Sequence, residues 1–114
     1  MPKLLSQANF SNITVTSLTT TSDSQAVLDV FSKVSYRSAK WQIQVTRGGT
    51  YHTVEFLVVH NGTATFNTEY AIIKTNDSLA TFDTDISGDN VRLLVTPASA
   101  SSTTFRVIRT SINT

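Results

Sequence analysis

Three side chains that could bind a transition metal lie near one another in the sequence, at His52, Glu55 and His60. Imidazole and carboxylate groups are ligands that zinc takes from proteins. If residues 50–60 form a strand, however, His52 and Glu55 point to opposite faces, and the two histidines lie about 26 Å apart. One ion cannot contact all three. We therefore expect no metal here, with His60 ending the strand beside a turn and His52 as an exposed cross-strand residue.

An acidic stretch, DTDISGDN at residues 83–90, opens like a calcium-binding loop, because Asp83, Asp85 and Ser87 follow the spacing of its first ligands. Such a loop ends on a glutamate at its twelfth position, where this sequence has Leu94. A loosely held Ca²⁺ remains an alternative. We interpret the stretch as a strand whose carboxylates face water and whose other side chains face inward, namely Phe82, Thr84 and Ile86.

Residues for catalysis show no recognisable arrangement. Glycoside hydrolysis needs two carboxyl groups, and Glu55, Glu69 and six aspartates could supply several pairs, but nothing marks one pair as buried. No serine lies in a G-x-S-x-G elbow, and no glycine-rich loop could hold a phosphate. We therefore predict no catalytic residues, no metal and no cofactor, and we predict that the chain is not an enzyme.

Composition limits the possible partners. The chain has 114 residues, no cysteine and a net charge of +1, which indicates one small domain without disulfides. Nine basic residues among eight acidic ones form no stripe that could bind nucleic acid. No apolar run approaches the ~20 residues that span a bilayer, and no signal peptide is recognisable. We expect a protein made in the cytoplasm that binds neither nucleic acid nor membrane.

Asn61-Gly62-Thr63 matches the signal for N-glycosylation and also the corner of a β-hairpin. Serine and threonine make up 33 of the 114 residues, so glycosylation patterns arise easily by chance. Both Asn and Gly tolerate the positive φ of a type I′ turn, and apolar strands flank them. We predict a hairpin with a type I′ turn.

Period-two alternation runs through most of the chain and predicts an all-β fold. Trp41, Ile43 and Val45 alternate with polar residues, which makes Trp41 a core residue, and the strand at 50–60 is apolar enough to be covered on both faces. Helix competes with strand only at residues 24–34, where we prefer strand. We predict an antiparallel β-sandwich or flattened barrel of seven or eight strands, including residues 40–45, 50–60, 64–73, 79–86, 91–96 and 103–112.

The first residues differ in character from the rest. Ile13 and Val15 could lie on a strand, but the following polar run offers little apolar surface to offset the entropy of ordering. We predict an extended arm over residues 1–24 and a sandwich domain over residues 25–114. The arm is either a frayed terminus or a segment that adds a strand to the edge of a neighbouring subunit.

Contact residues are the remaining functional signal. Strands rich in Thr and Ser repel one another weakly, which suits dense packing between copies. Tyrosine and arginine combine large contact area with a polar group. We therefore predict an interface that includes Tyr36, Arg37, Tyr51 and Tyr70, with Ile13 and Val15 contributed by the arm.

Residues 35–113 resemble a domain that recurs in virion structural proteins of tailed phages that infect marine bacteria, particularly cyanophages. The similarity is carried by YRSAKWQIQVT, EFLVVHNGT, LATFDTDISG and NVRLLVTP. The resemblance implies a structural protein of the virion, made in the host bacterial cytoplasm, without catalysis or cofactor.

Within a phage particle, the short chain and its leader favour a head decoration or cement protein. Such a protein would self-associate and bind the major capsid protein, adding interfaces that stabilise the shell. The alternative is a tail-fibre or baseplate appendage module that contacts the host or binds glycans. A carbohydrate-binding sandwich would use exposed tyrosines to stack on sugars.

Overall fold

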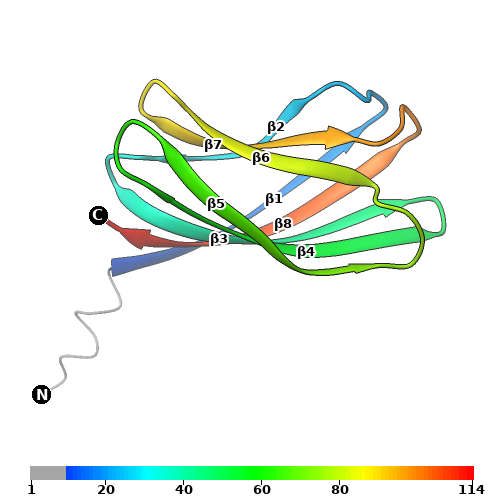
Figure 1. The fold of residues 1–114 in the computed structure, drawn as a ribbon, viewed down its shortest axis with the longest axis horizontal. Helices are drawn as coiled ribbons and strands as arrows, with labels where there is room; N and C mark the ends of the chain where they lie inside the picture. The colour runs from blue at the N-terminus through cyan, green and yellow to red at the C-terminus, as the bar shows by residue number, and fades with distance from the viewer. Residues whose placement is uncertain (1–9) are drawn as a thin grey trace, which may run out of the picture.

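The computed structural model describes residues 10–114, which form eight strands in two packed antiparallel sheets (Figure 1). The five-stranded sheet has the order β1-β8-β3-β4-β5, and the three-stranded sheet has the order β2-β7-β6. The predicted β-sandwich is therefore confirmed. The strands are β1 (Ser11–Thr20), β2 (Ala26–Ser32), β3 (Tyr36–Arg47), β4 (Thr50–His60), β5 (Thr65–Lys74), β6 (Ala80–Ser87), β7 (Asn90–Pro97) and β8 (Thr103–Asn113).

The core lies between the two sheets and follows the predicted alternation. Trp41 and Ile43, on the central strand of the large sheet, have no exposed surface, whereas Gln42 between them is exposed. The three-stranded sheet supplies the opposite wall, so each sheet buries one face. Further core residues are Leu28, Phe31, Val45, Val54, Phe56, Val58, Val91, Leu93, Val95, Phe105 and Val107.

The hairpin between β4 and β5 differs in detail from the predicted one. Residues 61–64 connect the strands, and of this loop only Gly62 has a positive φ, of 96°. A type I′ turn needs two such residues. Instead, the side-chain Oδ1 of Asn61 accepts hydrogen bonds from the backbone N–H groups of Thr63, at 3.0 Å, and Ala64, at 2.9 Å. The predicted hairpin is confirmed. The predicted type I′ turn is wrong, because in this loop the side chain of Asn61 takes the place of a backbone acceptor.

The ambiguous segment at residues 24–34 contains β2, so strand is the correct choice over helix. A bulge between Val27 and Asp29 shifts the register against β7. A bulge re-aims the side chains that follow it. Here it turns the Asp29 carboxylate toward the space between the sheets, where Arg109 and Trp41 bind it.

The predicted division at residue 24 needs correction. β1 pairs with β8 of the same chain in an unbroken register, from Ser11 opposite Ile112 to Thr20 opposite Thr103. Residues 11–20 therefore belong to the five-stranded sheet, because pairing with β8 satisfies one side of their backbone and Leu18 packs against the core. The part of the predicted arm at residues 1–9 lies outside the described residues. Within the described chain there is no helix long and apolar enough to cross a membrane.

Candidate interaction surface

The three-stranded sheet covers one side of the five-stranded sheet and leaves the other side uncovered. We call this uncovered side the outer face. The register places its side chains in rows across all five strands. One row reads Val15, Ile108, Gln42, Glu55, Tyr70; the next reads Ile13, Thr110, Lys40, Leu57, Thr68; a third reads Ser11, Ile112, Ser38, Val59, Phe66.

The outer face is unusually apolar for a surface in contact with water. Val15 is 76% exposed, Ile13 69% and Phe66 55%. The central strand β3 contributes the polar residues Lys40, Gln42 and Gln44, so the apolar side chains form two groups. One group lies on β1 and β8 and the other on β4 and β5. The members besides those three are Ile108, Ile112, Tyr51, Leu57, Val59, Tyr70 and Ile73. An exposed apolar area of this kind is typical of an interaction site.

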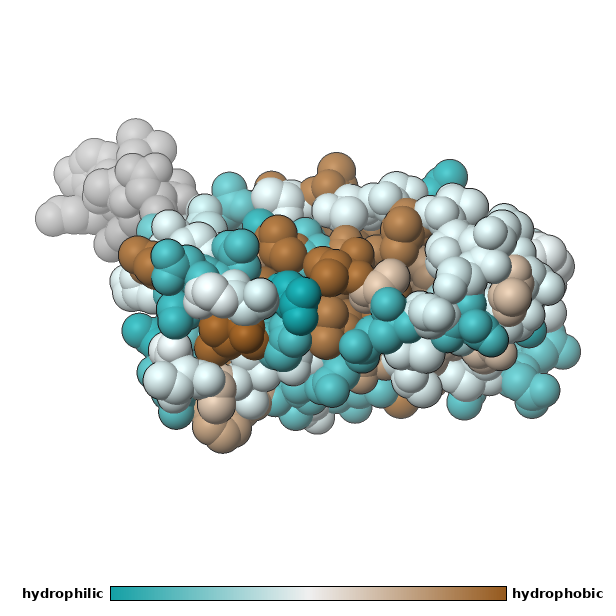
Figure 2. All heavy atoms as spheres, turned by 90° about the horizontal axis from the view of Figure 1, so that it is seen from above, coloured by the Kyte–Doolittle hydropathy of each residue, from teal (hydrophilic) through white to brown (hydrophobic). Residues whose placement is uncertain are grey.

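The side of the molecule that carries the three-stranded sheet shows a smaller apolar area. Figure 2 looks down on this side, where apolar residues gather in the middle and polar ones surround them. Val27 and Val30 are the large apolar side chains of β2 exposed there, at 44% and 43%. An ion pair between Arg92 and Asp85, at 2.6 Å, joins β7 to β6 on the same sheet. The outer face of the larger sheet is therefore the stronger candidate for binding.

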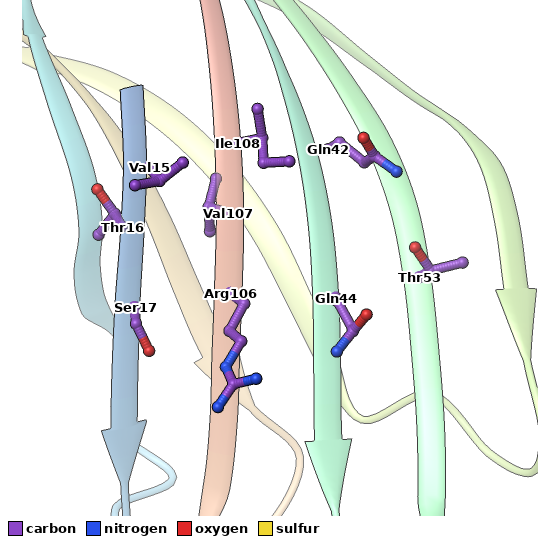
Figure 3. A pocket seen from close by; sticks show the side chains of 9 residues that line it. All are labelled: Val15, Thr16, Ser17, Gln42, Gln44, Thr53, Arg106, Val107 and Ile108. Atoms are coloured by element: carbon purple, nitrogen blue, oxygen red, sulfur yellow. The ribbon is translucent and has the colours of Figure 1, made fainter. Parts of the chain in front are cut away.

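A shallow depression of about 510 Å³ lies across β1, β8, β3 and β4. Figure 3 shows its side chains: Val15 projects from β1, Ile108 from β8 toward β3, and Gln42 and Gln44 from β3 on the side of β4. Arg106, also on β8, lies between Ser17 and Gln44 and forms no ion pair with any described residue. The depression offers hydrogen-bond donors and acceptors beside apolar walls, which suits contact with a protein or a sugar; its hydroxyls, on Thr16, Ser17 and Thr53, have no histidine or carboxylate beside them in the lining.

Four of the six predicted interface residues lie on the outer face, namely Ile13, Val15, Tyr51 and Tyr70. The other two lie elsewhere. Tyr36 packs edge-on against Phe31, with ring centroids 6.3 Å apart, and Arg37 donates to the backbone carbonyl of His60 at 3.1 Å. Their contact role remains a prediction. Other apolar residues of this face, Leu57, Val59, Phe66, Ile108 and Ile112, were missed, although the alternation along β8 is a signal that could have revealed its two isoleucines.

Both histidines hold loops in place. His60 accepts at Nδ1 from the backbone N–H of Gly62, at 3.0 Å, and its Nε2 lies 2.7 Å from the carbonyl oxygen of Tyr36, to which it donates. His52 accepts at Nδ1 from the N–H of Leu79, at 3.2 Å. Only 2% of His52 is exposed, so the predicted exposed position is wrong. The reason is parity: His52 shares the inner face of β4 with the core valines.

Burial lowers the pKa of His52 below its ordinary value of 6.5, and the positive charge of Lys74 lowers it further. The Nε2 atom of His52 is buried and has no hydrogen-bond partner among the described residues. The ring is therefore held neutral, because a charge there would lack both water and a counter-ion.

A buried ion pair crosses the core from β2 to β8. The Nη1 of Arg109 donates to Asp29 Oδ2 at 2.9 Å and to the Val30 carbonyl at 2.7 Å, and Trp41 Nε1 donates to the same carboxylate oxygen at 2.9 Å. The Arg109 guanidinium also lies 5.5 Å from the centre of the Phe31 ring. These partners satisfy the charges within the core, so the cluster joins the two sheets and forms no open site.

The acidic stretch on β6 is a strand, as predicted. Thr84 is buried, Phe82 and Ile86 pack against the core, and the hydrogen bond from Arg92 holds the pKa of Asp85 below its usual range. Within residues 10–114, no group of three or more histidine, aspartate and glutamate side chains is placed to hold a metal ion. That the chain is not an enzyme stays a prediction.

Neither a family model nor a curated protein matches the sequence. Solved structures with a similar fold include the tailspike protein of Acinetobacter baumannii phage AM24, with a TM-score of 0.53 and 9% identity over 99% of this chain and 28% of that one. The tailspike protein of Acinetobacter phage vB_ApiP_P1 has a TM-score of 0.54 and 18% identity over 90% and 21%.

A third similar structure is tailspike protein gp49 from Acinetobacter baumannii bacteriophage Fri1, which is described as a capsular polysaccharide depolymerase. Its TM-score is 0.49, and the two chains are 21% identical over 92% of this chain and 18% of that one. This third similarity is too low to support an inference. The chain spans less than a third of each of these proteins. At such identities the likeness establishes the fold, which it shares with phage virion proteins of Acinetobacter phages; it gives the marine cyanophage part of the expected resemblance no support.

Proposed function

We propose that this chain is a structural module of a phage virion, located in a tail appendage, and that it binds other virion proteins through its outer face. The observation that carries the proposal is the apolar outer face, which no other part of the described chain covers. Protein interfaces bury such areas, with aromatic and aliphatic residues at their centre. The shared fold with two tailspike proteins supports an appendage as the location.

A head decoration protein, the first expectation from the sequence, is the competing location. It would use the same face to bind the capsid lattice. Two solved structures with this fold are tailspike proteins, which is why we prefer the appendage.

The location can be tested on intact particles of the phage that encodes this chain. Gold-labelled antibodies against the chain should bind at the tail appendages in electron micrographs. Label distributed over the heads would support the decoration protein instead. Absence of the chain from purified particles, measured by mass spectrometry, would refute both.

The role of the outer face can be tested with two variants. Leu57→Lys and Phe66→Lys place a charge on the β4 and β5 side of the face, where both side chains are about half exposed. We expect each variant to fold, by circular dichroism, and to be lost from particles assembled in its presence, because an interface core excludes unpaired charge. Thr81→Lys, an exposed residue on β6, is the matched control and should still be incorporated. Equal incorporation of all three would refute the role of the face.

Glycan binding is a second candidate, favoured by one observation. Tyr51 and Tyr70 are both exposed on the outer face, at 50% and 36%, and a tyrosine ring can stack on a sugar. Polysaccharide from the surface of the host should then bind the purified chain in calorimetry, and Tyr51→Ala and Tyr70→Ala should each weaken binding. Unchanged binding in both variants, or none in the parent chain, would reject this function.

A further inference from the structure

We propose that β1 pairs edge to edge with β1 of a second copy of this chain, around a two-fold axis at Val15. The pairing would join two five-stranded sheets into one continuous sheet. It concerns the edge of the sheet and does not depend on the proposed function.

The sandwich has four edge strands, and three of them carry features that oppose pairing with another chain. β5 has a register shift against β4, a positive φ of 53° at Ala71, and the charges of Glu69 and Lys74. β6 presents Asp83 and Asp85. β2 contains a bulge. Bulges and charges are the usual means by which proteins protect an exposed sheet edge.

β1 has none of these protections. Its ten residues, SNITVTSLTT, include no charge, no proline and no glycine, and its register with β8 is unbroken. Among the described residues β8 is its one sheet partner, so about half of its backbone N–H and C=O groups face outward unpaired. A long, uncharged, regular edge is a template for a further strand.

The two sides of the sandwich, where β5 lies beside β6 and where β1 lies beside β2, also differ in the side-chain hydrogen bonds that join the two sheets. At the front of Figure 1, β5 and β6 are bridged by side chains: Asn67 Nδ2 donates to Thr84 Oγ1 at 2.6 Å, and that hydroxyl donates to Thr65 Oγ1 at 2.8 Å. At the back, β1 and β2 are joined by one long contact of 3.4 Å from Thr16 to Asp29. The β1 side is therefore the open side of the sandwich.

The partner that fits this edge is another β1. Pairing of any of the other edges with itself would bring like charges together or oppose two bulges, whereas β1 meets itself without either. An antiparallel pair centred on Val15 keeps both outer faces on one side and sets Ile13 opposite Ser17 of the second copy. Val15 and Ile13, among the most exposed apolar side chains of the chain, would then lie along the junction.

A second observation favours this register over one with the axis at Thr16. The Oγ1 of Thr14 is buried and has no hydrogen-bond partner among the described residues. With the axis at Val15, Thr14 lies directly opposite Thr16 of the second copy, where a change of the Thr14 rotamer would let the two hydroxyls form the hydrogen bond that facing threonines make across strands. An axis one residue along, at Thr16, would place Leu18 opposite Thr14 and leave the hydroxyl unpaired.

The chain contains no cysteine, so a single introduced cysteine reports one contact. Directly opposed residues on paired strands have Cβ atoms close enough for a disulfide. Val15→Cys should form a disulfide-linked dimer on mild oxidation. Ser11→Cys and Thr19→Cys should each stay unlinked alone and should link to each other when mixed. Val59→Cys, on β4, is the control and should link no faster than random collision allows.

Sedimentation equilibrium gives an independent test of the parent chain. We expect a monomer–dimer equilibrium in which Val15→Lys raises the dissociation constant about tenfold or more, because two like charges meet at the axis. Thr53→Lys, on β4 of the outer face, should leave the constant unchanged. A monomer at every concentration, a trimer, or equal linking of Val15→Cys and Val59→Cys would overturn the proposal.

Discussion

Two neighbouring valines on β4 show how differently the two faces of the large sheet are used. Val58 is 1% exposed and packs in the core, whereas Val59 is 43% exposed on the outer face. The residue type is the same, and the difference comes from the three-stranded sheet, which covers one face only. An apolar residue on this sheet is therefore either part of the core or part of a surface available for binding, depending on its parity along the strand.

Removing Arg109, the charge partner of Asp29 inside the core, should have the largest effect on stability. Arg109→Met leaves the Asp29 carboxylate buried and uncompensated, and we expect the free energy of unfolding to fall by about 3–5 kcal/mol. Urea unfolding followed by circular dichroism measures it. The control is Arg92→Met, which removes the half-exposed pair with Asp85 and should cost about 0–1 kcal/mol. Similar losses in both variants would contradict the difference between core and surface.

The two valines offer the most direct comparison. Val58→Ala removes two buried methyl carbons and leaves a cavity, so we expect a loss of about 2 kcal/mol. Val59→Ala, one residue along the chain, should change stability by less than about 0.5 kcal/mol. Chemical denaturation of the two variants under one condition gives the answer. An equal loss would mean that the outer face is covered in solution, as it would be in an assembly.

A smaller effect is expected at the bulge of β5. Ala71 has a φ of 53°, in the left-handed region that costs a residue with a Cβ atom about 1–2 kcal/mol. The extra residue lets Tyr70 and Ile73 both face outward, opposite Glu55 and Thr53. Ala71→Gly should raise stability by about 1 kcal/mol or less, since glycine also gains freedom in the unfolded chain. Ala98→Gly, an exposed residue without positive φ, should give no gain in the same thermal unfolding experiment.

The smallest effect on stability at neutral pH is expected from His52. Its pKa in the folded chain is lowered, so below its ordinary value of 6.5 the unfolded chain binds a proton that the folded chain does not. Stability should therefore be complete above that pH and should fall as the pH decreases through it. His52→Gln keeps an acceptor for the Leu79 N–H and should remove this part of the pH dependence, measured by denaturation at several pH values. An unchanged profile would exclude His52 as its source.

The strand pattern was predictable from the sequence because alternation depends only on neighbouring residues. Trp41, Phe82 and Thr84 lie inside as predicted. Parity fixes which residues share a face, but it does not say whether the second face is covered. The strand containing Leu57 and Val59 was expected to be covered on both sides for this reason, and the structure leaves the second side open.

Features that depend on distant partners were not predictable. Asp29 reaches the core because of a bulge and because Arg109, at the other end of the chain, meets it there. The polar run after Ile13 looked too weak to order by itself, yet β8 supplies the backbone partners for residues 11–20. For the candidate surface, the sequence indicated the tyrosines and, on β1, Ile13 and Val15. Phe66 belongs to the same surface because β5 pairs with β4, and that pairing is known only from the structure.

The pairing of β1 with β8 also bears on how the protein is made. β1 has its sheet partner in β8, so on the ribosome it must wait until residues 103–113 have been synthesised. Contacts between such distant segments form slowly. During that wait the nascent β1 is an unpaired, uncharged strand, open to the β8 of a neighbouring chain, and crowded synthesis of many copies would favour exchange of this strand between them.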